Sequence, residues 1–339
     1  MSWFIFALIC LLGWGLADLF YKKSTDEDDR YSHLKIAVWV GLVMGICAFG
    51  FLPFSETLIE GSISDFAVNA AKYLPASLGY IISMVIGYAG LRYLELSIVS
   101  PVQNASGAFS AIAMSVFFII TSQNVLESIS DETGFTFGIV SGTELLNNIL
   151  IVCGIFTIVV GVILLAVVEQ KLSKGEAGYP NENRKYRFGA LALIFPLLYC
   201  AFDTLGTAAD GIILSEESGL GLGEIDVIIL YGLTFFLAGI AAWIYLWIKE
   251  KKPYNPFAGK ERTKGVAAVC EEFGQIFYVY AMAEKPVLAA PMVASYCIVS
   301  VLLSRIFLKE KLKTSQYACI FAVIAGILML GISEGIGEM

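Results

Sequence analysis

Long apolar stretches separated by short polar links dominate the pattern of hydrophobic and polar positions along the chain. A helix that crosses a bilayer needs about 20 mostly apolar residues. Ten stretches meet this requirement: 2–21, 34–53, 71–92, 97–121, 148–168, 188–209, 226–248, 265–283, 286–308 and 315–333. The pattern therefore predicts an all-α integral membrane protein with ten transmembrane helices. The first stretch carries no basic residue before it, so we expect a retained span rather than a cleaved signal.

Composition leads to the same fold class. Hydrophobic residues make up 58% of the 339 residues and charged residues only 15%, whereas soluble domains average about 25% charged residues. The mean hydropathy is +0.76, which predicts a protein embedded in a lipid bilayer. We expect this bilayer to be the cell (plasma or inner) membrane. A formal charge of -8 gives no basis for binding nucleic acid.

Motifs for enzymes and bound metals are missing from the sequence. The seven cysteines occur singly in apolar runs, without a CxxC pair, and the single histidine cannot form a cluster. Walker, GxSxG and HExxH motifs do not occur. We therefore expect neither an enzyme nor a cofactor or metal site.

The two halves of the chain resemble each other. With a shift of 185 residues Asp18 falls on Asp203, and with a shift of 190 the pair Ser100-Pro101 falls on Ala290-Pro291. This predicts one five-helix repeat over 1–168, a cytoplasmic linker over 169–187 and a second five-helix repeat over 188–339. Since five is odd, the repeats should be inverted in the membrane, as in many secondary transporters.

Several short motifs resemble those of EamA-type transporters of the drug/metabolite transporter superfamily. They are Leu12-Gly13-Trp14-Gly15, Ser77-Leu78-Gly79-Tyr80 through Gly90-Leu91-Arg92-Tyr93 with Ser100-Pro101-Val102, and Tyr280-Ala281-Met282 with Ala290-Pro291-Met292 and Phe307-Leu308-Lys309-Glu310-Lys311-Leu312. The resemblance implies a ten-helix 5+5 fold and solute transport without ATP hydrolysis. It implies no particular substrate, because the superfamily carries amino acids, sugars, nucleotides, vitamins and cations.

Basic residues are distributed very unevenly between the two faces. All 22 Lys and Arg residues except Lys72 and Lys285 lie in or beside the links after spans one, three, five, seven and nine. Basic links remain cytoplasmic, so both termini are predicted to lie outside. EamA-type relatives usually have their basic links after spans two and four, so this chain departs from the family pattern.

Two adjacent acids lie near the centre of span eight. Because a charge within a span costs about 2.5–3.5 kcal/mol on insertion scales, Glu271 and Glu272 are functional candidates. Glu271, Gln275 and Tyr278 share one helix face. Two neighbouring carboxylates at low dielectric should not both ionise, which suits proton coupling; a structural hydrogen bond is the alternative reading.

Asp18 and Asp203 are the other intramembrane candidates. Each lies one helical turn after an aromatic residue, Trp14 or Tyr199, and a role in gating or substrate entry would suit both. For Asp18 a local pair with Lys22 at i+4 is the alternative.

Span four contributes the amides Gln103 and Asn104 close to Pro101, which is expected to kink the helix. These amides are read either as substrate hydrogen-bonding groups or as contacts between helices. Gly41 and Gly45 in span two, and Gly326 in span ten, predict close helix packing, within the chain or in a homodimer.

Together these features predict a proton-coupled secondary transporter with a midplane site for a small organic cation or amine. The acids make the site negative, and Trp14, Tyr199 and Tyr278 offer aromatic faces to a cation. An exporter of an amino acid or another zwitterionic or neutral metabolite, and a channel-like pore, remain as alternatives.

Overall fold

The computed structural model describes residues 2–26, 28–94, 96–121, 130, 133–137, 142–176, 194–215, 221–309 and 312–337. The long helices of the first half are α1 (Trp3–Ser24), α2 (Ser32–Phe51), α4 (Ile63–Gly90), α5 (Leu96–Asn104), α6 (Ser106–Thr121) and α8 (Gly142–Glu176). Those of the second half are α9 (Ile194–Leu214), α10 (Glu224–Glu250), α11 (Arg262–Glu284), α12 (Pro286–Ala294), α13 (Tyr296–Leu303) and α14 (Thr314–Gly337). Short elements are η1 (Leu52–Phe54), α3 (Glu56–Glu60), η5 (Gly259–Glu261) and the π-helical turn η6 (Ser304–Leu308).

The membrane class predicted from the sequence is confirmed. Among the described residues, nine helical segments are long and apolar enough to cross a membrane. The remaining predicted span is the eighth, 265–283. It corresponds to α11, which has 23 residues and packs along α1 but contains two adjacent acids. The chain is a multi-pass α-helical membrane protein.

Large apolar side chains cover much of the outer surface of the bundle. Ile46 is 65% exposed, Phe156 66% and Phe321 68%, and they come from helices far apart in the chain. Such patches are rare on soluble monomers. Lipid tails are their natural neighbours, because contact with lipid avoids exposing this area to water.

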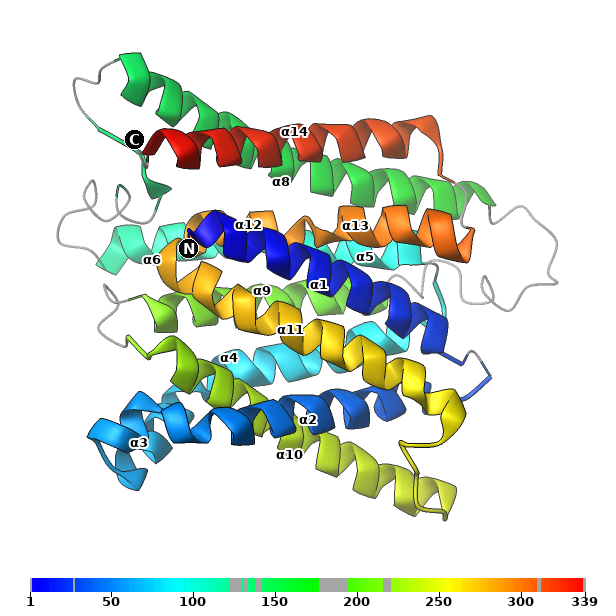
Figure 1. The fold of residues 1–339 in the computed structure, drawn as a ribbon. Coiled ribbons are helices and arrows are strands. Elements are labelled where there is room, and N and C mark those ends of the chain that lie inside the picture. Colours follow the sequence, from blue (N-terminus) through cyan, green and yellow to red (C-terminus); the bar gives the residue numbers. More distant parts are fainter. Residues whose placement is uncertain are drawn as a thin grey trace.

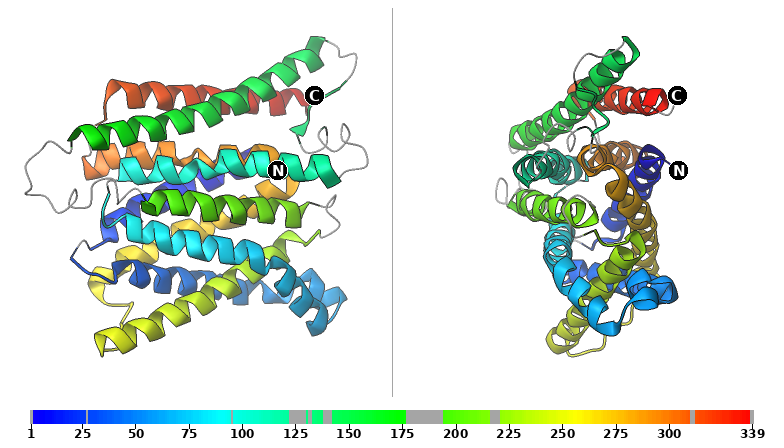
Figure 2. Two further views of the ribbon diagram at one scale, coloured as in Figure 1. Left: turned by 180° about the vertical axis from the view of Figure 1, so that it is seen from behind. Right: turned by 90° about the vertical axis from the view of Figure 1, so that its left-hand side faces the viewer.

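The helices run roughly alongside one another (Figure 1). α8 and α14 pair at one edge of the bundle, and α2 and α10 pair at the other. Between these edges α1 packs along α11, α4 packs along α9, and α6 packs on α12 (Figure 2). Both chain ends lie at the same end of the bundle, together with α3 (Figure 1).

Glycines permit the closest helix contacts. A Cβ atom on Gly79 of α4 would lie 2.9 Å from the Cα atom of Gly206 on α9, and one on Gly41 of α2 would lie 2.8 Å from that of Gly239 on α10. Gly45 also faces α10, and Gly326 of α14 faces Ile158 of α8. The small-residue faces for which a homodimer was an alternative are therefore covered within the chain.

Spans four and nine are each divided into two helices rather than continuous. α5 passes into α6 at Ala105, and α12 passes into α13 at Ser295. The kink expected at Pro101 thus appears one turn later, at Ala105. Side-chain donors bond carbonyl groups beside the breaks: the Asn104 Nδ2 atom donates to the Ser100 oxygen at 2.8 Å, and the Ser295 Oγ atom to the Met292 oxygen at 2.5 Å.

Several predicted boundaries differ from the structure. α4, predicted to begin at residue 71, begins at Ile63. Span six was expected to end at residue 209, but α9 continues to Leu214, because the apolar residues after Asp210 extend the helix. α8 likewise continues to Glu176, so the predicted linker over 169–187 begins as helix. The remainder of that linker lies outside the described residues.

Candidate functional site

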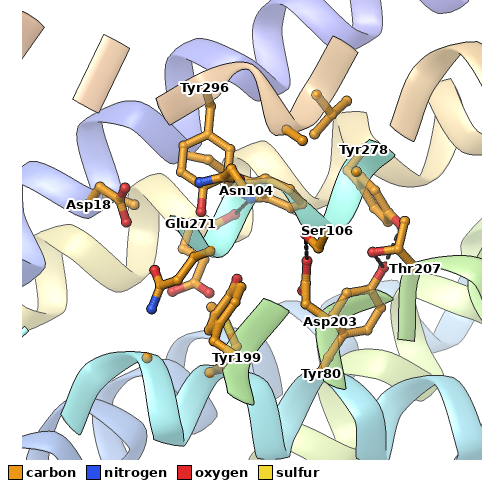
Figure 3. Close-up of a pocket in the computed structure, with 18 of the residues that line it drawn as sticks. Asp18, Tyr80, Asn104, Ser106, Tyr199, Asp203, Thr207, Glu271, Tyr278 and Tyr296 are labelled. Carbon is orange, nitrogen blue, oxygen red and sulfur yellow. Dashed lines mark hydrogen bonds between the residues drawn. The ribbon is translucent and has the colours of Figure 1, made fainter. Parts of the chain in front are cut away.

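A cavity lies in the middle of the bundle, between helices from both halves of the chain (Figure 3). α1, α4, α5 and α6 contribute one part of its wall, and α9, α10, α11, α12 and α13 the other. Its volume is about 60 Å³. Because one water needs roughly 10–15 Å³ of such space, the cavity has room for only a few waters or one small solute in this conformation.

Nearly all the residues predicted from the sequence to form the site line this cavity. They are Trp14, Asp18, Gln103, Asn104, Tyr199, Asp203, Glu271, Gln275 and Tyr278. Glu272 is not among the lining residues. The charged side chains of the lining are three acids, and the described part of the wall contains no Lys, Arg or His.

Asp18 joins three helices. Its Oδ2 atom accepts hydrogen bonds from Ser100 of α5 at 2.6 Å and from Ser300 of α13 at 2.7 Å. The Lys22 ammonium, the expected alternative partner, donates to the carbonyl oxygens of Leu91 and Leu94 at 2.6 and 2.8 Å. Asp18 is therefore held by hydroxyl groups at the cavity wall.

Glu271 is held by two tyrosine hydroxyls. Tyr21 of α1 and Tyr88 of α4 both donate to its Oε2 atom, the latter at 3.0 Å. The side chain is 3% exposed. This arrangement links α11 to α1 and α4 and leaves the carboxyl group at the cavity wall.

Glu272 has a different environment, although it is the next residue along the helix. It meets the thiol of Cys47 on α2, and its Oε2 atom has no hydrogen-bond partner among the described residues. A helix rotates about 100° per residue, so the two neighbouring carboxylates point towards different helices.

Asp203 accepts a hydrogen bond from Ser106 of α6 at 2.6 Å. In Figure 3 it lies beside Tyr80 and Thr207, whereas Asp18 and Glu271 lie on the other side of Tyr199. The Tyr199 hydroxyl donates to the sulfur atom of Met84 at 3.5 Å. The three acids are thus spread across the cavity rather than clustered.

Aromatic rings line the cavity between these acids. Trp14 is stacked on Tyr278 with ring centroids 5.1 Å apart, and meets Tyr296 edge-on at 5.6 Å. The Trp14 Nε1 atom donates to the Glu271 carbonyl oxygen at 3.1 Å, which orients the indole. Close helix contact keeps it there, because a Cβ atom on Gly274 would lie 2.4 Å from the Trp14 ring.

The three amide side chains at the cavity differ in their hydrogen bonding. The Asn104 Nδ2 atom donates to Ser100 in its own helix, so its hydrogen-bond donors are largely used at the break in span four. The Nε2 atoms of Gln103 and Gln275 have no hydrogen-bond partner in the described residues, although these side chains are only 5% and 2% exposed. Both residues line the cavity, where a solute would find unused donors.

Residues 217–332 match the EamA-like transporter family. The match confirms the resemblance inferred from the motifs, and it supports a membrane transporter of small molecules. No match was found among curated proteins. One solved structure, described as "Crystal structure of protein", matches with 12% identity and a TM-score of 0.55, over 97% of this chain and 96% of the other. At that identity the likeness shows the fold alone.

Sequence reasoning missed one buried acid beside the cavity and several tyrosines in its wall. Asp210 is 0% exposed and lies two turns after Asp203 on α9. Its i+7 spacing from Asp203 was a signal that it shares that face, but it fell just beyond the predicted end of span six. Tyr21, Tyr80 and Tyr88 were not identified as site residues, since an uncharged tyrosine in an apolar stretch lacks the insertion cost that marks an acid.

Proposed function

We propose that this EamA-like protein is a proton-linked secondary transporter of a small organic cation or amine, bound in the central cavity. One observation carries the proposal: the cavity wall holds Asp18, Asp203 and Glu271 and, among the described residues, no basic side chain. A cation would offset the cost of keeping these acids away from water. The rings of Trp14 and Tyr278 add faces that attract cations.

Proton linkage follows from competition for the same carboxylates. An acid in this low-dielectric site avoids ionisation unless it has a positive partner. An arriving ammonium group would favour release of a proton from an acid such as Glu271, and a proton would favour release of the amine. Exchange of one for the other would couple transport to the pH gradient.

An inverted repeat would provide the alternating access that such exchange requires. The breaks at Ala105 and Ser295 are separated by the same 190 residues as the Ser100-Pro101 and Ala290-Pro291 pairs. If α1 corresponds to α9 and α4 to α11, the α1–α11 contact has its counterpart in the α9–α4 contact. These correspondences support two equivalent halves around the cavity.

An amino acid or another zwitterion is the second candidate substrate. The unpaired Nε2 donors of Gln103 and Gln275 favour it, because they could bind a carboxylate while the acids bind the amino group. A cation without an acceptor group would leave both donors unused.

A thermal-shift screen of the purified protein tests the proposal. Ligand that binds only the folded state raises its stability by mass action, so amines should raise the melting temperature, and neutral sugars of similar size should not. Amino acids that stabilise the protein more than their decarboxylated amines would favour the second candidate.

Variants in the cavity sharpen the screen. Asp203→Asn and Asp18→Asn should retain their acceptor oxygens and fold normally, but stabilisation by the amine should decrease in both and transport should be impaired more in Asp203→Asn. Wild-type responses in both variants would contradict the proposed site, and ion conductance without saturation would indicate a channel-like pore instead.

A further inference from the structure

A second polar cluster lies next to the cavity but outside its lining. It consists of Asp210 on α9 and Tyr73 on α4, both 0% exposed, with Tyr80 and Tyr278 between them and the cavity. Neither carboxylate oxygen of Asp210 has a hydrogen-bond partner among the described residues, and nor does the Tyr73 hydroxyl. A buried acid and a buried hydroxyl thus face each other without a well-formed hydrogen bond between them.

The position of this cluster along the bundle is well defined. On α9 the cavity-lining residues Tyr199, Asp203 and Thr207 follow one another by about one turn each, and Asp210 continues this face towards Leu214. α9 ends at the side where both chain termini lie (Figure 1). Asp210 therefore lies between the cavity and the terminal side of the membrane.

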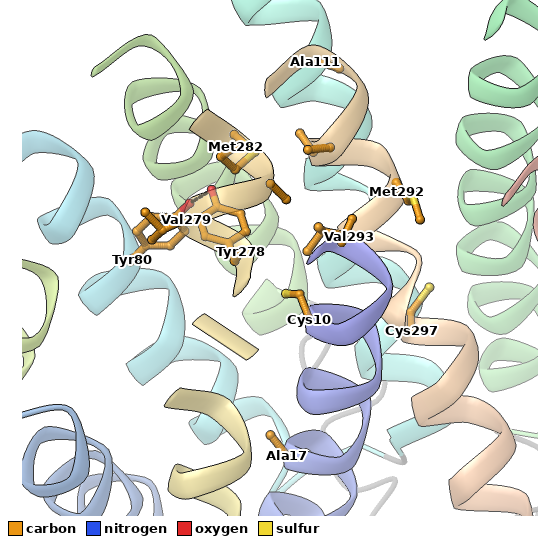
Figure 4. Packing of buried hydrophobic residues seen from close by; sticks show 14 of the residues in the cluster. Cys10, Ala17, Tyr80, Ala111, Tyr278, Val279, Met282, Met292, Val293 and Cys297 are labelled. Carbon is orange, nitrogen blue, oxygen red and sulfur yellow. Dashed lines mark hydrogen bonds between the residues drawn. The ribbon is translucent and has the colours of Figure 1, made fainter. Parts of the chain in front are cut away.

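Hydroxyl groups lie between the cavity and this acid. The Tyr80 hydroxyl donates to the Thr207 Oγ1 atom at 3.1 Å and forms a short hydrogen bond with the Tyr278 hydroxyl (Figures 3 and 4). Both tyrosines line the cavity and also face Asp210. Such a chain of hydroxyls can pass a proton between a solute site and a carboxyl group.

In the part of the chain that the structure describes, the surroundings of Asp210 contain no cation to balance a negative charge. The titratable groups that face it are Tyr73 and Tyr80 from α4 and Tyr278 from α11, with Tyr231 of α10 and Asp203 of its own helix farther away. Beyond it, Gly211 is surrounded by Met114, Met282 and Pro286. A carboxylate in such a setting is satisfied most simply by binding a proton.

We propose that Asp210 is a proton-binding site separate from the substrate cavity, on its terminal side and divided from it by Tyr80 and Tyr278. The transport role of this proton rests on the proposed function, but the existence of the protonated acid does not. Glu271 and Asp210 would then serve opposite sides of one cavity.

The first test reads the proton directly and needs no substrate. At neutral pH the infrared spectrum of the purified wild type should contain the carbonyl band of a protonated carboxyl. The spectrum of Asp210→Asn should lack this band, so the difference between the two spectra should show it. Tyr73→Phe should shift that band, because the Tyr73 hydroxyl faces the acid. Asp226→Asn is the matched control: this acid is 2% exposed but accepts a hydrogen bond from the Thr57 nitrogen at 3.0 Å, so its variant should leave the band unchanged.

Failure of the two proposals can be told apart. If Asp210→Asn keeps the whole protonated-carboxyl signal, or if sodium ions abolish that signal in the wild type, the proton site is wrong whatever the substrate is. If the band is lost as expected but no amine stabilises the wild type, the proposed function fails and the proton site stands. Where an amine does bind, Asp210→Asn should keep that binding and lose amine-driven proton movement into proteoliposomes.

Discussion

The two adjacent glutamates of α11 can each be replaced by glutamine. The two single variants distinguish the role of an acid that lines the cavity from that of an acid packed against another helix. Glu271 lines the cavity and accepts hydrogen bonds from Tyr21 and Tyr88. Glu272 meets Cys47 on α2 instead. The substitutions are chemically identical and one residue apart, so Glu272→Gln is a matched control for Glu271→Gln.

The expected size of the effect follows from these contacts. A hydrogen bond to a charged group contributes about 1.5–3 kcal/mol. If Glu271 binds the amine, loss of its charge should weaken affinity about tenfold to about 150-fold, since each tenfold change corresponds to about 1.4 kcal/mol. Folding should change little, because the amide oxygen can still accept from the two tyrosine hydroxyls. Glu272→Gln should leave affinity unchanged.

The assay pairs pH-driven uptake with substrate counterflow in proteoliposomes. If Glu271 carries only the coupling proton, Glu271→Gln loses pH-driven uptake and keeps counterflow, because an amide cannot exchange a proton. If it also binds the substrate, both activities decrease together with affinity. Wild-type behaviour of both variants in both assays, or a greater loss in Glu272→Gln, would refute the reasoning.

Three further predictions concern topology, packing and pH. Tags at both termini should be reached by an impermeant protease in intact cells, since the basic links lie at the other side; protection of both tags would reverse the orientation. Gly79→Ala should lower the melting temperature, at a cost of about 1–3 kcal/mol, because its Cβ atom would meet Gly206 at 2.9 Å, whereas Gly50→Ala, with nothing within 4 Å, should not. Burial raises the pKa of Asp29, but the hydrogen bond and charge of Lys35 at 2.8 Å lower it more, so the net pKa lies below the ordinary value. This contribution to stability is present above the ordinary carboxyl pKa and is lost as pH falls through the lowered one; Asp29→Asn should therefore cost under about 1 kcal/mol at neutral pH, and its melting curve should converge with that of the wild type in acid.

Local patterns were sufficient for the class of protein and for most of the candidate site. Hydrophobic length along the chain determines where membrane helices form, because each helix satisfies its backbone hydrogen bonds internally. The cost of charge in lipid made Asp18, Asp203 and Glu271 conspicuous in sequence, and the shift of 190 residues already paired Ser100-Pro101 with Ala290-Pro291.

Packing between distant segments decided the rest. Only the approach of α1 and α4 to α11 brings Tyr21 and Tyr88 to Glu271, and only the contact with α2 turns Glu272 towards Cys47. The buried setting of Asp210 likewise depends on α4 and α11. The hydropathy of one helix indicates the free-energy cost of placing a polar group in lipid. The neighbour that offsets this cost comes from helices up to hundreds of residues away, so only the tertiary structure determines it.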